Sequence, residues 1–248
     1  MSPVLLITGA SRGIGAATAL LAAKHGWAVA VNYTRDAQAA EQVVQAIRTN
    51  GGQAQAFQAD VGVEADIERL FQSVDKDMGV LGGLVNNAGV LDVTARVDNT
   101  SWERLERIMR INVLGSFACA KQAVLRMSTA HGGKGGSIVN LSSAAAKLGA
   151  PSQYVDYAAS KGAIDTLTVG LAKEVAAEGI RVNAVRPGII LTDIHASGGI
   201  PDRANQLAHQ VPMLRPGTAT EVAEAIVWLL SDAASYVNGT NIDVGGGR

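Results

Sequence analysis

Cysteine, charge of one sign and long apolar runs are all scarce in this chain of 248 residues. Cys119 is the single cysteine, so no disulfide can form within the chain, and we expect a buried free thiol in a reducing compartment. Lys and Arg number 21 against 22 Asp and Glu, which gives a formal net charge of −1 at pH 7. Because no basic run is present to hold a phosphate backbone, nucleic acid is not an expected partner.

No apolar run approaches the roughly 18 residues that a transmembrane helix needs. The N-terminus passes from Met-Ser-Pro directly into Val4-Leu5-Leu6-Ile7, without the basic start and apolar stretch of a signal peptide. We therefore expect a cytoplasmic protein with no membrane partner. The histidines show no spacing typical of metal ligands, so no metal site is expected. With 48% apolar and 17% charged residues, the composition excludes a disordered chain.

Glycine, in contrast, is abundant, and short β-branched runs alternate with longer helical patterns along the chain. The 28 glycines stand against only 3 Phe, 3 Trp and 4 Tyr, which indicates many tight turns and close backbone approaches. The alternation predicts a doubly wound α/β fold, with a mostly parallel seven-stranded sheet and helices on both faces. We expect strands near residues 4–7, 28–32, 54–58, 83–85, 137–141, 181–185 and 242–244. We expect helices near residues 13–25, 37–50, 64–78, 102–127, 154–177 and 221–230.

No segment has the composition of an interdomain linker or the period of a repeat, so residues 1–248 are expected to form one domain. Residues 192–216 have the weakest periodicity, and a short helix is predicted near residues 202–209 within them. An irregular insertion of this kind in a compact domain often covers a site. We therefore predict a substrate lid at residues 192–216.

A glycine-rich segment, Thr8-Gly9-Ala10-Ser11-Arg12-Gly13-Ile14-Gly15, follows the first predicted strand and opens the first helix. Glycines at such a turn let the backbone approach a diphosphate, and the helix N-terminus supplies N–H donors and a favourable dipole. The spacing differs from G-x-G-x-x-G, because three residues separate Gly9 from Gly13 and one separates Gly13 from Gly15. The segment predicts a dinucleotide site with contacts from Gly9, Ser11, Arg12, Gly13, Ile14 and Gly15.

The spacing of this loop resembles the T-G-x-x-x-G-x-G motif of the short-chain dehydrogenase/reductase family. Asn86-Asn87-Ala88-Gly89 follows the fourth strand, where the family has its N-N-A-G motif, and Asp60 follows the third strand, where the family has a residue near the adenine. The resemblance extends over the whole chain in the family's order, and it is to single-domain members such as glucose dehydrogenase-like and 3-oxoacyl-acyl-carrier-protein reductase-like enzymes. It implies cofactor contacts from Asp60, Val61, Asn87, Ala88 and Gly89.

Tyr157 and Lys161 are four residues apart on a predicted helix, so both side chains lie on one face and can reach the same ligand. A phenol with a pKa of about 10 is a poor proton donor at neutral pH, and a nearby ammonium shifts it toward phenolate. The family resemblance implies that Tyr157 is the catalytic acid or base. It also implies that Lys161 binds the nicotinamide ribose and tunes Tyr157.

The resemblance implies further roles around this pair. Ser143, after the strand at residues 137–141, would bind the substrate oxygen, and Ser142 stays open as the alternative because the loop to Tyr157 is one residue longer than the family usually has. Asn112 would support a water chain from Lys161 to solvent. Cofactor contacts on the nicotinamide side would come from Pro187, Gly188, Ile189 and Thr192.

The end of the second strand decides between the two dinucleotides, since NAD enzymes place an acid there and NADP enzymes place cations near the 2′-phosphate. The strand ends with Asn32, which carries no charge, and Arg35 follows just beyond it; both are expected to contact the cofactor. Arg12 in the glycine loop could flank the same phosphate, whereas Asp36 opposes it. We therefore favour NADP(H), with NAD(H) as the alternative.

These observations predict an oxidoreductase that exchanges a hydride between nicotinamide and a carbonyl or secondary alcohol carbon of a small molecule, such as a sugar or simple ketone. The alternatives are a 3-oxoacyl-acyl-carrier-protein reductase and, from another class, a catalytically silent dinucleotide-binding protein. The substrate pocket is expected to involve Leu91, Lys147, Tyr154, Ile194 and His195.

Self-association is expected as well, because the two long helices at residues 102–127 and 154–177 carry more small side chains than one core-facing stripe needs. The family resemblance implies a homotetramer, with a homodimer as the alternative. Three arginines of the first helix, Arg104, Arg107 and Arg110, are interpreted as a solvated face or an ion-pair network. The small side chains proposed for the interface are Ala118, Ala120, Ala123, Ala158, Ala159, Ala163 and Ala172.

Overall fold

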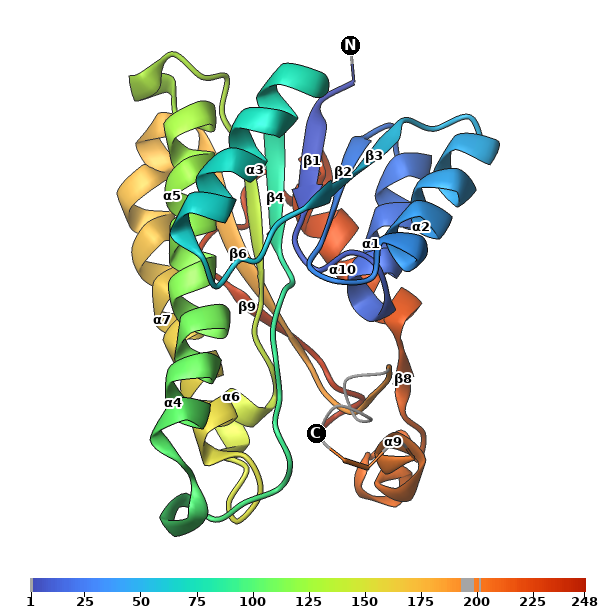
Figure 1. Cartoon of the computed structure of the whole chain (residues 1–248), viewed down its shortest axis with the longest axis vertical. Coiled ribbons are helices and arrows are strands. Elements are labelled where there is room, and N and C mark those ends of the chain that lie inside the picture. The colour runs from blue at the N-terminus through green and yellow to red at the C-terminus, as the bar shows by residue number, and fades with distance from the viewer. Residues whose placement is uncertain (1, 193–198, 201) are drawn as a thin grey trace.

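A seven-stranded sheet forms the centre of the computed structural model, which describes residues 2–192, 199, 200 and 202–248 (Figure 1). The strand order is β3-β2-β1-β4-β5-β6-β9, and every neighbouring pair is parallel. This confirms the predicted doubly wound α/β fold. The strands are β1 (Val4–Ile7), β2 (Ala28–Tyr33), β3 (Ala54–Gln58), β4 (Leu81–Asn86), β5 (Gly136–Leu141), β6 (Ile180–Pro187) and β9 (Asn241–Val244).

Helices cover both faces of this sheet (Figure 1). One face carries α1 (Gly13–Lys24), α2 (Ala37–Thr49) and α10 (Ala219–Leu230), and the other carries α3 (Glu64–Asp77), α5 (Gly115–Met127) and α7 (Val155–Val175). The sequence of β1 is apolar throughout because helices cover both faces of this strand. Leu5 and Ile7 pack under the first helix layer, whereas Val4 and Leu6 pack under the second. A strand covered on both faces needs apolar residues at every position.

The helix predicted at residues 102–127 is divided in the structure. It consists of α4 (Trp102–Met109), a π-helical turn η2 (Arg110–Leu114) and α5. Gly115 explains the close packing at this point, because a Cβ there would lie 2.5 Å from the carbonyl oxygen of Val61. Turns of this kind inside helices are frequent at functional sites.

Other boundaries differ from the prediction by a few residues. β4 begins at Leu81 rather than near residue 83, because Gly82 and Gly83 weaken the sequence signal for a strand. Gly82 is needed there, since its Cβ would meet the side chain of Pro3 at 2.9 Å. The sequence did not predict α6 (Ala145–Leu148), β7 (Ile190–Leu191), β8 (Gly217–Thr218), η1 (Val97–Asn99), η3 (Thr129–His131), η4 (Ala176–Glu178) or η6 (Asp232–Ala234).

Of the segment predicted as a lid, the described residues 202–216 lie beside the carboxyl ends of the strands (Figure 1). β7 and β8 pair in parallel at its two ends. The predicted short helix at residues 202–209 consists of α9 (Arg203–Gln206) followed by η5 (Ala208–Gln210). Residues 193–198 and 201 of this segment lie outside the described residues.

The order in which strands are added to the sheet switches sides at β1. β2 and β3 lie on one side of it, and β4 and the later strands lie on the other. Ligands of doubly wound folds bind in the crevice at such a switch point, at the carboxyl ends of the strands. The glycine loop follows β1 and Asn87-Ala88-Gly89 follows β4, so the fold brings these two predicted motifs together at that crevice.

Candidate active site

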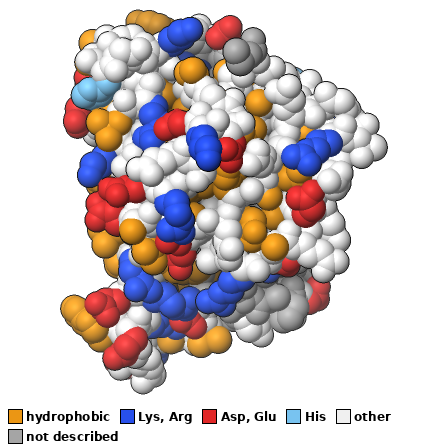
Figure 2. Space-filling model, turned by 45° about the horizontal axis from the view of Figure 1, so that its top comes forward, with side chains coloured by type: hydrophobic (Ala, Val, Ile, Leu, Met, Phe, Trp, Pro, Cys, Tyr) orange, Lys and Arg blue, Asp and Glu red, His pale blue; other side chains and the backbone are white. Residues whose placement is uncertain are grey.

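A cleft of about 1110 Å³ opens at the carboxyl ends of the strands. Figure 2 shows a group of Lys and Arg side chains low on the visible face. The cleft itself is rich in cations, which favours an anionic ligand such as a dinucleotide. Its lining includes Arg12, Arg35, Arg107, Arg110, Lys161, Arg203 and Arg248.

The glycine loop forms one wall of the cleft, with Gly9, Ser11, Arg12, Gly13 and Ile14 in the lining. Gly9 and Gly13 have φ of +61° and +57°, the left-handed region where glycine is unstrained. Arg12 stands at the N-cap of α1 in extended conformation, and neither a side-chain cap nor an acid occupies the first turn of that helix. The N–H groups of this end are therefore available to an anion in the cleft.

Asn87 joins the glycine loop to the end of β4. The hydroxyl of Thr8 accepts the N–H groups of Asn87 and Ala88, both at 3.0 Å. The Asn87 amide donates to the carbonyl oxygens of Thr8 and Gly9, at 2.8 and 2.9 Å. Asn87, Ala88 and Gly89 all line the cleft, and these bonds hold their loop against the glycine loop.

Two residues predicted as cofactor contacts lie behind the cleft wall instead of lining it. Gly15 is buried, and a Cβ there would lie 2.6 Å from the Asn87 amide, so this glycine makes room for the loop packing. Asn32 is 1% exposed; its Oδ1 accepts the Gly9 N–H at 3.1 Å, and its amide donates to the carbonyls of Phe57 and Ala59. Asn32 braces the glycine loop, because its polar atoms are directed at backbone groups.

Tyr157, Lys161 and Ser143 meet in the cleft, as the sequence predicted. The Lys161 ammonium lies 5.6 Å from the centre of the Tyr157 ring and donates to the Leu141 carbonyl at 2.6 Å. Burial lowers the pKa of Lys161 to about 8, while the nearby Asp165 raises it. Burial also raises the pKa of Tyr157 to about 12, against a lowering effect from a hydrogen bond with Ser143. Desolvation therefore outweighs the expected shift toward phenolate, and Tyr157 carries its proton at neutral pH.

Ser142 and Ser143 have different surroundings. Ser142 is 3% exposed, and its hydroxyl donates to the Lys161 carbonyl at 3.1 Å, which ties the end of β5 to α7. The Ser143 hydroxyl accepts the Ala145 N–H at 3.1 Å, lines the cleft and lowers the pKa of Tyr157. Of the two serines, this geometry favours Ser143 as the group beside the reacting oxygen.

Asn112 lies in the π-helical turn, behind Tyr157 and Lys161. Its Oδ1 accepts the Val90 N–H at 2.8 Å, and its amide donates to the Val90 carbonyl at 3.0 Å and to the Ser160 hydroxyl at 3.1 Å. Both Asn112 Oδ1 and the Lys161 ammonium lie 3.5 Å from the position that a Cβ on Gly89 would take. The two groups thus face a common space beside Gly89, which is compatible with the predicted proton relay.

The adenine side of the cleft contains the predicted Asp60 and Val61 together with Arg12, Arg35 and Asp36. Asp60 accepts the Gly62 N–H at 2.8 Å, and Asp36 caps α2 by accepting the Ala39 N–H at 2.9 Å. In the part of the chain that the structure describes, Arg12 and Arg35 make no ion pair or side-chain hydrogen bond. The two guanidinium groups are exposed at the cleft and free for a phosphate.

The opposite wall contains Pro187, Gly188, Ile189 and Thr192, all of which were predicted. Gly188 packs against the backbone of Gly245, where a Cβ would lie 2.7 Å from the Gly245 Cα. This contact attaches the end of β6 to the chain after β9. It positions the wall that faces the glycine loop.

The substrate end of the cleft contains residues that the sequence did not predict. Asp92, Arg107, Arg203 and Arg248 are among these lining residues, and Arg110 lines the cleft beside Gly62 and Asp60. No motif marks them, since they come from segments far apart in the chain: the loop after β4, the helix that includes α4 and η2, α9 and the end of the chain. Among the predicted pocket residues, Leu91 and Tyr154 line the cleft, Lys147 pairs instead with Asp243, and Ile194 and His195 lie outside the described residues.

Membrane-spanning helices and metal-binding clusters are both absent from residues 2–192, 199–200 and 202–248. No helix there is long and apolar enough to cross a membrane. No group of three or more His, Cys, Asp or Glu side chains there could hold a metal ion. Cys119 is buried, and burial raises the pKa of its thiol to about 12.

Comparisons with known proteins agree with this geometry. A family model described as Enoyl-(Acyl carrier protein) reductase matches residues 9–248. The chain is 54% identical over 245 residues to the uncharacterized oxidoreductase YgfF of Escherichia coli K12, with 99% of each chain covered. It is 36% identical over 250 residues to the 3-oxoacyl-[acyl-carrier-protein] reductase FabG of Staphylococcus aureus Mu50, with 100% of this chain and 98% of the relative covered.

A solved structure is similar over nearly the whole chain. It is a double mutant of a short-chain dehydrogenase/reductase from Serratia marcescens, with a TM-score of 0.91 and 32% sequence identity. The match covers 99% of this chain and 97% of that one.

Proposed function

This chain belongs to the short-chain dehydrogenase/reductase family of oxidoreductases, which use NAD(P)(H), and we propose that it exchanges a hydride between NADP(H) and a small carbonyl or alcohol. The substrate class that we propose is a sugar or simple ketone and its secondary alcohol. The observation that carries the proposal is the meeting of Tyr157, Lys161 and Ser143 in one cleft with the glycine loop.

The cleft fits a dinucleotide by the chemistry of its walls. The uncapped N-terminus of α1 offers N–H groups to a diphosphate, and Gly13 leaves the loop backbone open at the cleft. Arg12 and Arg35 would bind a 2′-phosphate, and Asp36 is less of an obstacle than the sequence suggested, because its carboxylate accepts a backbone N–H of α2. These groups support NADP(H) over NAD(H).

When bound, a reduced nicotinamide supplies the hydride that reaches the carbonyl carbon. In this proposal the Ser143 hydroxyl holds the carbonyl oxygen, and Tyr157 gives its proton to that oxygen as negative charge develops there. The Lys161 ammonium then stabilises the phenolate that remains on Tyr157. A proton from solvent, carried by the proposed water chain beside Asn112 and Lys161, restores the phenol. One ketone, one hydride and one proton therefore give one alcohol.

The substitution Tyr157→Phe tests the proposal, because it removes the proton donor and keeps the ring. We expect kcat to fall by about 10² to 10⁴, the usual contribution of such a proton transfer, with nearly unchanged NADPH affinity by fluorescence titration. Tyr236→Phe is the matched control, since Tyr236 is fully exposed and lies outside the cleft lining. If the Tyr157→Phe protein keeps more than about a tenth of the wild-type kcat, another group is the acid.

A 3-oxoacyl-acyl-carrier-protein reductase is the second candidate. The similarity to FabG of Staphylococcus aureus over the whole chain supports it. NADPH oxidation should be compared between a 3-oxoacyl group on acyl carrier protein, the same group on a small thioester, and a panel of sugars and ketones. Preference for the carrier-bound substrate would favour this candidate, whereas no oxidation with any substrate would favour the catalytically silent protein.

Three sequence expectations stay predictions alongside this proposal. They are a single catalytic domain over residues 1–248, a lid at residues 192–216 and a cytoplasmic location.

A further inference from the structure

Arg104 of α4 forms a buried ion pair with Asp156, the residue before Tyr157. Arg104 Nε lies 2.6 Å from Asp156 Oδ2, and Nη2 lies 3.1 Å from Oδ1. The third nitrogen, Nη1, donates to the Val93 carbonyl at 2.6 Å. The two side chains are 9% and 4% exposed. The ion-pair interpretation of this arginine from sequence is therefore confirmed, and solvent screens the pair little.

Asp156 acts directly on the backbone of Tyr157. Its Oδ1 accepts the Tyr157 N–H at 2.9 Å, at the start of α7 where helical carbonyl partners are absent. At the other side of the residue, the Ser160 hydroxyl donates to the Tyr157 carbonyl at 2.7 Å. Asn112 in turn donates to the Ser160 hydroxyl. Side chains therefore hold both polar groups of the Tyr157 backbone.

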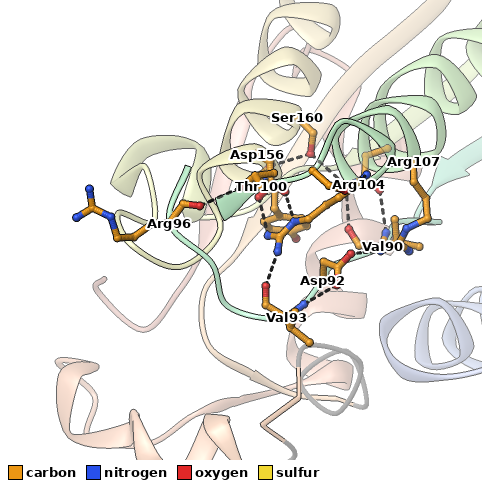
Figure 3. Close-up of polar contacts among 12 residues, drawn as sticks. Val90, Asp92, Val93, Arg96, Thr100, Arg104, Arg107, Asp156 and Ser160 are labelled. Carbon is orange, nitrogen blue, oxygen red and sulfur yellow. Dashed lines mark hydrogen bonds and ion pairs between the residues drawn. The ribbon is translucent and has the colours of Figure 1, made fainter. Parts of the chain in front are cut away.

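The helix α4, which carries Arg104 and Arg107, also holds the segment at Leu91 and Asp92 that lines the cleft. Figure 3 shows Arg104 between Asp156 and Val93, with Arg107 directed at Asp92. Arg107 lies 2.5 Å from the Asp92 carboxylate, whose other oxygen accepts the Val93 N–H at 2.8 Å. Because Leu91 and Asp92 line the cleft, α4 connects the substrate wall to the residue next to Tyr157.

We infer that Arg104 and Asp156 are positioning residues for the reaction: their buried pair sets the place of the Tyr157 phenol relative to the cleft wall at Leu91 and Asp92. This inference rests on the proposed function, in which Tyr157 transfers the proton. Proton transfer requires donor and acceptor at hydrogen-bonding distance, and small displacements slow it strongly. The pair therefore acts on the chemical step and leaves the distant dinucleotide walls unchanged.

The test removes both charges at once with Arg104→Met/Asp156→Leu. Loss of one partner would leave an uncompensated buried charge and endanger the fold, whereas apolar replacement of both partners is often tolerated. We expect kcat to fall at least tenfold, with the Kd for NADPH within about twofold of wild type. The isotope effect on hydride transfer from 4-deuterated NADPH should rise, because the chemical step becomes slower.

Arg104→Lys is the conservative variant, and it keeps the charge. A single ammonium cannot bond both Asp156 oxygens and the Val93 carbonyl in the fork geometry of a guanidinium, so we expect an intermediate loss of kcat. Arg126→Met/Asp75→Leu is the matched control, because Arg126 Nε pairs with Asp75 at 2.7 Å between α5 and α3, away from the cleft. This control should keep wild-type kcat.

A second readout does not depend on turnover. With tyrosine labelled by ¹³C at the ring Cζ, the Tyr157 signal can be identified in the NMR spectrum by its loss in Tyr157→Phe. In Arg104→Met/Asp156→Leu we expect this signal to shift or broaden, while the signal of Tyr236 stays unchanged. Wild-type kcat together with an unchanged Tyr157 signal in the folded double variant would overturn the inference. A wild-type protein that reduces no carbonyl would instead count against the proposed function, and the NMR comparison would still test the pair.

Discussion

At the scale of single residues, Lys161 combines a proposed catalytic role with an energetic cost. It is 4% exposed, and burial lowers its pKa to about 8 from an ordinary value of 10.5. A depression of this size corresponds to roughly 3 kcal/mol of differential interaction between the two protonation states. Burial thus disfavours the positive charge of Lys161, and the same charge places a cation beside Tyr157.

We predict that Lys161→Met raises the free energy of unfolding at pH 7 by about 1–3 kcal/mol while it abolishes turnover. Between pH 8 and pH 10 the unfolded wild-type chain binds more protons at Lys161 than the folded one, so wild-type stability should rise with pH through this window. That rise should be reduced in the variant. Urea denaturation at several pH values measures both effects.

Lys173→Met is the control for this prediction, because Lys173 is exposed on the same helix. Its effect on stability should stay within about 0.5 kcal/mol, as for other surface substitutions. A destabilised Lys161→Met protein would mean that the bond to the Leu141 carbonyl contributes more than the burial of the charge costs.

At the scale of elements, the proposed preference for NADP(H) depends on where α1 begins and where β2 passes into α2. β2 ends at Tyr33 and α2 begins at Ala37, so Arg35 lies in a short exposed connection at the cleft. Asp36 caps α2, as residues at this position often do, because a carboxylate satisfies a free N–H of the first turn. The Asp36 carboxylate therefore caps α2, and the Arg35 guanidinium beside it is available to a ligand in the cleft.

We predict that Arg35→Ala and Arg12→Ala each weaken NADPH binding much more than NADH binding. A charge-assisted hydrogen bond contributes about 1.5–3 kcal/mol, which corresponds to roughly 10- to 150-fold in affinity. Fluorescence titration of both cofactors measures the two affinities. Equal losses for NADH and NADPH would contradict the assignment of these arginines to the 2′-phosphate. Arg48→Ala is a suitable control, because Arg48 donates to the Ala54 carbonyl and lies outside the cleft lining.

At the scale of the whole molecule, the helix layer of α4, α5 and α7 leaves large apolar side chains exposed. Four of the alanines predicted for an interface are buried within the chain itself. They are Ala120, Ala123, Ala158 and Ala172. The exposed apolar residues are different ones, and large apolar side chains exposed on one helix layer are a feature of surfaces that contact other subunits. On these helices and the turn η2 they are Trp102, Leu114, Phe117, Leu125 and Val155, and near the C-terminus they include Trp228 and Tyr236.

We predict that the protein forms a homotetramer in which these surfaces are covered, with a homodimer as the alternative. Light scattering coupled to size exclusion at micromolar concentration should give the mass of four chains of 25.6 kDa. Phe117→Lys should lower this mass, because it places a charge in one apolar surface. Val80→Lys should leave the mass unchanged. Val80 is also exposed, at 65%, but it lies in the turn before β4 and not on the helices that carry the exposed apolar residues. A monomer of 25.6 kDa in the wild type would contradict the prediction.

The sequence alone was sufficient for the parallel sheet, the order of helices and strands, and the family. Apolar strands such as β1 and helices of regular period are local patterns, and the glycine loop and the Tyr157–Lys161 spacing are local motifs, so each can be read without knowing what lies nearby in space. The sequence also led to the meeting of the two loops after β1 and β4, because parallel strands bring their carboxyl ends to one edge.

Only the tertiary structure decided the properties that depend on neighbours distant in the chain. Asn32 ends the second strand predicted from sequence, at the expected cofactor site, yet contacts with Gly9, Phe57 and Ala59 make it a brace behind that site. Arg104 has the spacing of an exposed helical residue, yet Asp156, 52 positions later, makes it a buried ion-pair partner. The balance of desolvation and hydrogen bonding at Tyr157 likewise follows from packing. Burial and long-range pairing are properties of the assembled chain, because they depend on which distant segments the fold places side by side.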